Sequence, residues 1–421
     1  MRVCVVGSGG REHCLAAALA PDVEVVVAPG NPGIRRSGVA TSPLDPEELE
    51  ADLFVVGPEA PLVGGLADRL RARGRLVFGP GADGARLEGS KSWMKSLLGE
   101  AGVPTARHVS VTDLEEGRRW LSRARPPYVV KADGLAAGKG VLVTADFGEA
   151  LADLEAKLSG RAFGEAGRRV VLEEALFGEE LSVLAVCDGR RAVALAPAQD
   201  YKRLSDGDRG PNTGGMGAYS PVPFAPQAVV DRVMDEVVEP VLSGLRSRGV
   251  DYRGVLYAGL MLEEDGPKVV ELNVRFGDPE TQVVLPRLEG GLADLLAEAA
   301  SGRLHSQPRF GDQAAVTVVM AADGYPTSPR RGDIIQGVEE AEAREGVVVY
   351  FAGTGLDAEG RLVSDGGRVL DVTAVGPDLA TARARAYEAV GAISFEGARY
   401  RSDVASPQRV GQPAGAGREG R

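Results

Sequence analysis

Residues 269–281 read Val-Val-Glu-Leu-Asn-Val-Arg-Phe-Gly-Asp-Pro-Glu-Thr, and this stretch is the most informative part of the chain. Its apolar start predicts a β-strand, and if the strand continues, a period of two places Glu271, Asn273 and Arg275 on one face. Mg²⁺ takes hard oxygen ligands such as carboxylate and amide, and arginine stabilises charge on a transferring phosphoryl group. The stretch therefore predicts a metal–phosphate site; the alternative is an exposed face of salt bridges.

The segments around this stretch predict strand pairs with intervening helices from Pro104 to about Ser301. A hairpin is expected from Val255–Glu263 and Lys268–Asn273. The first hundred residues differ, because short apolar runs such as Val3–Val6 alternate with helical stretches such as Arg11–Ala20. That alternation is typical of βαβ units and a parallel sheet.

A glycine-rich turn, Val6-Gly7-Ser8-Gly9-Gly10-Arg11-Glu12-His13, lies between the first predicted strand and helix. Glycines there allow backbone N–H groups to approach an anion at a helix N-terminus. Glu12 replaces the third glycine of a dinucleotide fingerprint, so the turn does not support NAD binding. It predicts a phosphate site or, alternatively, a tight turn without a ligand.

Residues 131–140, Lys-Ala-Asp-Gly-Leu-Ala-Ala-Gly-Lys-Gly, differ from a Walker A loop in spacing and precede a strand rather than a helix. A glycine flap between two strands would bring Lys139 over phosphates, with Lys131 pointing inward. The alternative is a solvated hairpin with two surface lysines. Farther along, residues 173–180 predict either a solvated acidic edge or an adenosine site.

The polar, glycine-rich segment 199–217 is too irregular for a regular element and carries many specific donors. A long loop of this kind within a compact domain is typical of a functional site.

Composition narrows the class of protein. The 421-residue chain has a net charge of −12, which disfavours a nucleic-acid binder. Its longest uncharged apolar run, Ala314–Ala322, is far shorter than the roughly 20 residues that span a membrane. Three cysteines without a C-x-x-C pair exclude a disulfide framework. A cytoplasmic protein is expected, with no nucleic-acid or membrane partner.

These motifs together resemble the phosphoribosylamine–glycine ligase family of ATP-grasp enzymes. The matching stretches include Gly7–His13, residues 57–63 (Gly-Pro-Glu-Ala-Pro-Leu-Val), Lys131–Gly140, Gly210–Tyr219 and Arg275–Gln282. The resemblance implies a mixed α/β and α+β multidomain protein. It comprises a Rossmann-like domain at 1–103, an ATP-grasp domain at 104–306 with a lid at about 120–190, and a C-terminal α+β domain at 313–405. The tail, 406–421, is expected to be disordered.

The resemblance also implies an activity: ATP phosphorylates glycine, and 5-phosphoribosylamine attacks the resulting glycyl phosphate. ATP and Mg²⁺ (or Mn²⁺) are the implied cofactors, and a monomer or weak homodimer is expected. Each role maps onto a residue of this sequence, as follows: ATP contacts by Lys95, Lys131, Glu173, Glu174, Leu176 and Glu180; metal binding by Glu271 and Asn273; catalysis by Arg275 and Lys139; substrate binding by Gly9, Gly10, Glu59, Asp208 and Asn212.

Two other functions compete with this one. The first is another ATP-grasp carboxylate–amine ligase of purine metabolism, against which the loop 206–217 argues. The second is a nonenzymatic nucleotide-binding protein on the same fold, which would be expected to lose Glu271, Asn273 or Arg275.

Overall fold

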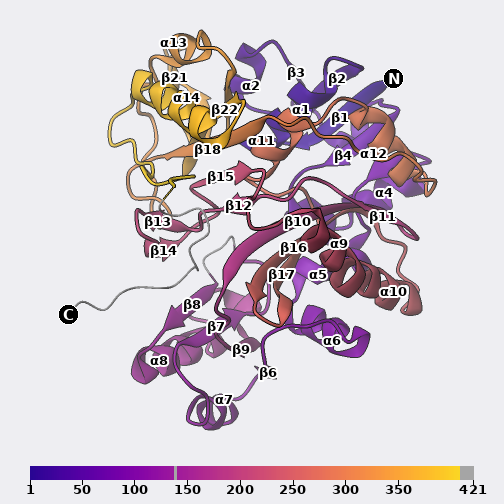
Figure 1. The fold of residues 1–421 in the computed structure, drawn as a ribbon, viewed down its shortest axis with the longest axis vertical. Helices are drawn as coiled ribbons and strands as arrows, with labels where there is room; N and C mark the ends of the chain where they lie inside the picture. Colours follow the sequence, from indigo (N-terminus) through magenta and orange to yellow (C-terminus); the bar gives the residue numbers. More distant parts are fainter. Residues whose placement is uncertain (137–139, 408–421) are drawn as a thin grey trace.

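The computed structural model describes residues 1–136 and 140–407 (Figure 1). The N-terminal and C-terminal sheets lie at the top of the view, a lid lies at the bottom, and a central sheet lies between them. Lys139 and the tail residues 408–421 lie outside the described residues.

The N-terminal sheet is parallel throughout, with strand order β3-β2-β1-β4-β5. The expected βαβ architecture is confirmed. Its strands are β1 (Arg2–Gly7), β2 (Glu24–Pro29), β3 (Ala40–Thr41), β4 (Leu53–Val56) and β5 (Val77–Phe78). Its helices are α1 (Gly10–Leu19), α2 (Pro32–Arg36), α3 (Glu59–Val63), α4 (Leu66–Ala72) and α5 (Ala82–Gly89), with a 3₁₀ turn at Pro46–Glu48.

A helix, α6 (Lys91–Ala101), leads from this sheet to the lid. The lid is an antiparallel sheet of order β6-β9-β7-β8. Its strands are β6 (His108–Val111), β7 (Tyr128–Ala132), β8 (Val141–Thr144) and β9 (Val170–Glu174). Two helices, α7 (Leu114–Leu121) and α8 (Phe147–Leu158), and a 3₁₀ turn at Gly164–Gly167 complete it. The lid has its own apolar core, which includes Val130, Leu154 and Leu172.

The central sheet is antiparallel, with strand order β11-β10-β16-β17. Its strands are β10 (Glu179–Asp188), β11 (Ala192–Ala194), β16 (Arg253–Glu263) and β17 (Gly266–Asn273). Helices α9 (Gln227–Val233), α10 (Glu239–Ser247), α11 (Thr281–Val284) and α12 (Leu292–Ala300) belong to the same part of the chain. A π-helical turn, Met234–Val238, joins α9 to α10, and a 3₁₀ turn follows α11 at Leu285–Arg287.

The C-terminal sheet combines distant segments, with strand order β12-β15-β18-β22-β19. Its strands are β12 (Gln199–Asp200), β15 (Gly217–Ser220), β18 (Ala314–Ala321), β19 (Val347–Phe351) and β22 (Arg368–Gly376). Two hairpins, β13 (Arg203–Ser205) with β14 (Arg209–Asn212) and β20 (Thr354–Leu356) with β21 (Leu362–Ser364), flank it, as do helices α13 (Val338–Glu342) and α14 (Leu379–Ala392).

The expectation that residues 199–217 form no regular element is therefore wrong. The segment forms β12, the β13–β14 hairpin and the start of β15. Its strands are only two to four residues long, and β15 pairs with β18 about a hundred residues later. Strands this short gain their stability from distant partners rather than from a local sequence pattern.

Candidate active site

A buried ion cluster of two lysines and one glutamate lies between α6 and the lid sheet. Lys131 Nζ of β7 donates to Glu173 Oε2 of β9 at 3.0 Å and to the carbonyl oxygen of Val270 at 3.1 Å. Lys95 Nζ of α6 lies 3.1 Å from the same Glu173 oxygen. All three side chains are buried, so both alternatives, a surface hairpin for Lys131 and a solvated edge for Glu173, are wrong.

Burial and neighbouring charges shift the pKa values of this cluster in opposite directions. Burial lowers the pKa of Lys95 to about 8, although the Glu173 carboxylate opposes the change. Burial would raise the pKa of Glu173, but Lys131 and Lys95 offset that effect and hold it below the usual value. Two ammonium groups share one carboxylate here, so the cluster has an excess of positive charge that would attract phosphate.

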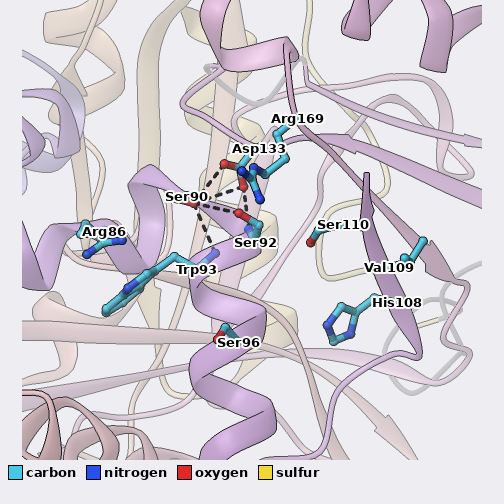
Figure 2. Close-up of a pocket in the computed structure, with 10 residues that line it drawn as sticks. All are labelled: Arg86, Ser90, Ser92, Trp93, Ser96, His108, Val109, Ser110, Asp133 and Arg169. Carbon is cyan, nitrogen blue, oxygen red and sulfur yellow. Dashed lines mark hydrogen bonds between the residues drawn. The ribbon is translucent and has the colours of Figure 1, made fainter. Parts of the chain in front are cut away.

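Asp133, at the end of β7, connects this cluster to α6 (Figure 2). Its carboxylate accepts hydrogen bonds from Ser92 N at 2.6 Å and Ser90 Oγ at 3.0 Å, at the N-terminus of the helix. A carboxylate there is favoured by the helix dipole. The contact fixes the two lysine-bearing elements relative to one another, a role that sequence reasoning missed.

A cavity of about 680 Å³ lies beside these contacts, and Figure 2 shows α6 and β6 on either side of it. The lining residues are Arg86, Ser90, Ser92, Trp93, Ser96, His108, Val109, Ser110, Asp133 and Arg169. This set contains none of the residues predicted for the active site.

The residues predicted to hold adenosine lie at the end of β9, in the connection that follows it and at the start of β10. Glu174 N donates to the carbonyl oxygen of Arg107 at 2.9 Å, so this amide already has a hydrogen-bond partner within the protein. Leu176 is half-buried in the connection between the two strands. The carboxylate of Glu180 lies 3.4 Å from Lys202 Nζ.

Glu271 and Asn273 lie on β17, and both are half-buried. In the paired strand β16, Gly259 lies opposite Glu271, and a Cβ on Gly259 would lie only 3.0 Å from Glu271 Cγ. The glycine therefore leaves room for the carboxylate. Lys202 lowers the pKa of Glu271 to about 2, with further help from Lys131 and Arg275, so the carboxylate is ionised.

The donor set fits a metal held partly by substrate. Among residues 1–136 and 140–407, no group of three or more His, Cys, Asp or Glu side chains is arranged to hold a metal. An ionised carboxylate and an amide supply two hard oxygens, and Mg²⁺ commonly completes its shell with phosphates and water. Glu271 and Asn273 would be its protein ligands.

Lys202, which follows β12, was missed by sequence reasoning. Its Nζ atom lies 3.4 Å from both Glu180 Oε2 and Glu271 Oε1. The nearby carboxylate of Asp200 contributes most to raising the pKa of Lys202 against the effect of burial. The position of this lysine after an aspartate in the polar segment was the available signal, but its pairing with Glu271 depends on the fold.

Arg275 lies two residues beyond the end of β17, so the expected strand does not reach it. Burial nevertheless still alternates, with Leu272 and Val274 buried. Arg275 Nη2 donates to Glu88 Oε1 at 3.1 Å, and its Nε lies 3.6 Å from Glu59 Oε2. Glu88 and Glu59 raise the pKa of Arg275 despite burial, so its charge is permanent.

The glycine turn lies beside this arginine. Arg11 Nη1 donates to the carbonyl oxygen of Phe276 at 3.0 Å. Gly9 N donates to Glu12 Oε2 at 2.6 Å, so the carboxylate of Glu12 occupies the anion position expected for a phosphate at Gly9. A Cβ on Gly10 would lie 1.8 Å from Asp371 Oδ2 of the C-terminal sheet, so Gly10 is required by packing.

The remaining predicted substrate residues lie on the β13–β14 hairpin. Asp208 Oδ1 accepts a hydrogen bond from Arg401 Nη1 at 2.8 Å, which is an internal contact that sequence reasoning did not foresee. Asn212 is half-buried at the end of β14 and pairs with Arg203. The structure thus places the hairpin next to Lys202, which lies beside Glu271, while Glu59 lies beside Arg275 and the glycine turn contacts Glu12 and Asp371.

Two antiparallel sheets, with buried lysines on α6 and on the lid and a Glu-x-Asn pair on the central sheet, define the ATP-grasp class of protein. Solved structures agree with the class at the level of the fold. The biotin carboxylase domain of Hydrogenobacter thermophilus 2-oxoglutarate carboxylase, at 16% identity, aligns with a TM-score of 0.72 over 95% of this chain and 91% of its own.

The chain belongs to the phosphoribosylamine–glycine ligase family. The family models for the N, ATP-grasp (A) and C domains of phosphoribosylglycinamide synthetase match residues 1–88, 89–281 and 315–407. Phosphoribosylamine–glycine ligase of Streptomyces coelicolor is 49% identical over 96% of this chain and 99% of its own. That of Mesorhizobium japonicum is 47% identical, with 96% and 97% covered.

A crystal structure of phosphoribosylamine–glycine ligase from Thermotoga maritima aligns with a TM-score of 0.85 at 38% identity, covering 96% of this chain and all of its own. This chain is therefore an ATP-dependent ligase of purine biosynthesis. No helix in the described part of the chain is long and apolar enough to cross a membrane.

Proposed function

We propose that the site joins glycine to 5-phosphoribosylamine through glycyl phosphate. A carboxylate oxygen of glycine attacks the γ-phosphorus of ATP, and the bond to ADP breaks. The amine nitrogen of phosphoribosylamine then attacks the acyl carbon, phosphate leaves, and the nitrogen loses one proton. The observation that carries this proposal is the gathering of lysines beside Glu271 of β17. Lys202 Nζ lies 3.4 Å from Glu271 Oε1, and Lys131, which shares Glu173 with Lys95, donates to the carbonyl oxygen of the preceding residue, Val270.

Each group has a definite role in this proposal. Lys95 and Lys131 bind ATP phosphates, and Glu173 holds the two lysines in place. The segment from Glu174 through Leu176 to Glu180 borders adenosine. Glu271 and Asn273 hold Mg²⁺, or Mn²⁺ in its place, which when bound would screen the phosphate charge. Arg275 stabilises charge on the acyl phosphate, and Lys139, outside the described residues, contributes from the flap.

Phosphoribosylamine is assigned to the region around Gly9, Gly10 and Glu59, beside Arg275. Because Glu12 occupies the anion position at Gly9 in the described state, its carboxylate must move or the phosphate must bind next to it. Asp208 and Asn212 shape the substrate side through the hairpin. This division keeps ATP and the amine on opposite sides of the acyl phosphate.

We also propose domain limits near residues 103 and 306–313, with the lid taken as 108–174, the extent of its sheet, instead of about 120–190.

The three cysteines are free and buried, which suits a reducing compartment, and we place the enzyme in the cytoplasm. A monomer or weak homodimer remains the expectation, to be checked by sedimentation velocity.

The test is ADP release with ATP, glycine and freshly prepared phosphoribosylamine, each omitted in turn. Full turnover is expected only with all three. Glycine labelled with ¹⁸O in its carboxylate distinguishes the route: transfer of one ¹⁸O atom to inorganic phosphate is expected. Unlabelled phosphate would exclude glycyl phosphate, and glycine-independent turnover would exclude the proposed function.

A further inference from the structure

The segment after α14 returns to the active-site side of the molecule and ends against the β13–β14 hairpin. Arg401 of this segment is completely buried. Its Nη1 donates to Asp208 Oδ1 at 2.8 Å and to the carbonyl oxygen of Arg203 at 3.1 Å. The guanidinium carbon lies 4.7 Å from the centre of the Tyr201 ring. One arginine therefore contacts the start, the tip and the base of the hairpin.

Three neighbouring hydrogen bonds also join this segment to the turn of the hairpin and to Tyr201. Ser402 N donates to Asp206 Oδ1 at 2.8 Å, Gly207 N donates to Asp403 Oδ2 at 2.9 Å, and Ala405 N donates to Tyr201 OH at 2.9 Å. Asp403 also accepts from Arg401 Nε at 2.7 Å, which orients the guanidinium. The segment thus forms hydrogen bonds with every residue of the turn, 206–208.

The backbone conformation of Asp208 explains why the turn needs these contacts. Asp208 has φ = 55°, in the left-handed region that residues other than glycine seldom adopt. This conformation is unfavourable unless surrounding contacts hold it. The charge-assisted bond from Arg401 supplies such a contact.

The hairpin also contacts Lys202, which lies beside the proposed metal ligand Glu271. Thr213, just after β14, donates to the carbonyl oxygen of Lys202 from its N at 2.8 Å and from its Oγ1 at 2.9 Å. The Lys202 ammonium in turn lies 3.4 Å from Glu271 Oε1. A continuous set of polar contacts therefore runs from Arg401 to a carboxylate assigned to the metal.

We propose that Arg401 is a positioning residue for the ligase reaction. It fixes the β13–β14 hairpin, and through the hairpin it fixes Lys202 against Glu271, in the geometry that activation of the glycine carboxylate requires. The inference rests on the proposed function for the identity of that carboxylate. A guanidinium suits the task because its planar set of donors reaches Asp208, Asp403 and a carbonyl oxygen at once.

The test compares Arg401→Ala, Arg401→Lys, Asp208→Ala and the Arg401→Ala/Asp208→Ala double variant with the wild-type enzyme. Arg399→Ala is the matched control, because Arg399 lies in the same segment but donates to Asp323 at 2.9 Å instead of to the hairpin. The measurements are kcat, KM for glycine, the dissociation constant of ADP without Mg²⁺, and the thermal midpoint.

For Arg401→Ala we expect kcat to fall at least tenfold and KM for glycine to rise, while ADP binding changes less than twofold. Arg401→Lys should be impaired in the same way, because lysine cannot make the forked contact. The kcat of the double variant should be within about twofold of that of Arg401→Ala, since both single variants remove the same Arg401–Asp208 hydrogen bond. Arg399→Ala should retain wild-type kinetics.

Turnover of Arg401→Ala within twofold of wild type would overturn the proposal. An equal loss of ADP binding would do the same by indicating general damage to the domain, and so would additive effects in the double variant. If Arg401→Ala does not fold, Asp208→Asn decides, because it removes only the charge and should lower kcat in the same manner. Dependence of the wild-type enzyme on glycine tests the proposed function separately.

Discussion

Lys131 Nζ lies 3.0 Å from Glu173 Oε2, and this buried contact changes the role expected for Glu173. A carboxylate that neutralises two lysines is a structural counter-ion before ATP arrives, whereas a ribose ligand would leave its oxygens free. Of the two carboxylate oxygens of Glu173, Oε2 accepts from the lysines and Oε1 has no hydrogen-bond partner among the described residues. The two roles differ in which part of ATP they affect.

Glu173→Gln should therefore weaken binding of ATP at least tenfold and leave binding of adenosine within twofold. Without the carboxylate, which raises the pKa of Lys95, the charged form of Lys95 is less stable, so the phosphate site loses positive charge. Calorimetric titration with both ligands checks this, with Glu115→Gln, at an exposed position of α7 in the same lid, as the control. Equal losses for adenosine and ATP would assign Glu173 to the ribose.

Lys95 predicts a pH dependence of nucleotide binding. Its pKa is lowered to about 8, and only the protonated form attracts phosphate. ATP affinity of the free enzyme should therefore be greatest below pH 8 and fall as pH rises through about 8 to 9. Because arginine stays protonated, Lys95→Arg should flatten the profile. Dissociation constants measured from pH 6.5 to 9.5 check this; an unchanged slope in the variant would assign the titration to another group.

The parallel N-terminal sheet could be predicted from the sequence because its apolar strands alternate with helices over short distances. Segment 199–217 could not, since its strands depend on pairing with β18 and on contacts from residues 401–405. A π-helical turn, Met234–Val238, precedes α10, which begins at Glu239 beside Pro240. Proline lacks the N–H that would continue the regular helical ladder.

At the site, the residues that could be found carry chemistry in a local pattern, as Glu271 and Asn273 do at a spacing of two. Glu88, Lys202 and Arg401 act across large sequence separations. Glu88 Oε2, for example, accepts a hydrogen bond from Val274 N at 2.9 Å. Nothing in the sequence around such a residue indicates its partner, so only the folded arrangement identifies it.

Glu271→Gln and Asn273→Ala should each lower turnover by at least a hundredfold while the fold persists. Each variant loses a hard oxygen ligand, and a hundredfold loss corresponds to about 2.7 kcal/mol of transition-state stabilisation. Steady-state kinetics across a Mg²⁺ series and circular dichroism check this. Glu264→Gln, on the exposed turn of the same hairpin, should behave as wild type. Near-normal turnover of both site variants at saturating Mg²⁺ would contradict the metal assignment.

Gly10 should tolerate no side chain unless Asp371 is shortened. A Cβ at residue 10 would lie 1.8 Å from Asp371 Oδ2, so Gly10→Ala should lower the free energy of unfolding by about 1–3 kcal/mol through overpacking. Asp371→Ala should restore much of this stability in the double variant. Denaturant unfolding of the four proteins checks the coupling. If Gly10 served only a substrate phosphate, the double variant would show no recovery.

Asp371 predicts that stability falls as pH rises. Burial, with a further contribution from Asp278, raises its pKa from 3.8 to about 7. The folded chain therefore holds a proton that the unfolded chain releases, so the charged form opposes folding increasingly between pH 4 and 7 and fully above 7. Asp371→Asn keeps a neutral group of the same shape beside Gln282, whose Nε2 donates to Asp371 Oδ2 at 2.9 Å. If about 1 kcal/mol is recovered, the variant should melt about 2–4 °C above wild type at pH 8, with the difference vanishing near pH 4. Calorimetry at both pH values checks this, with the exposed Asp22→Asn as control; a variant equally or less stable at pH 8 would mean that Asp371 is ionised without penalty in the folded enzyme.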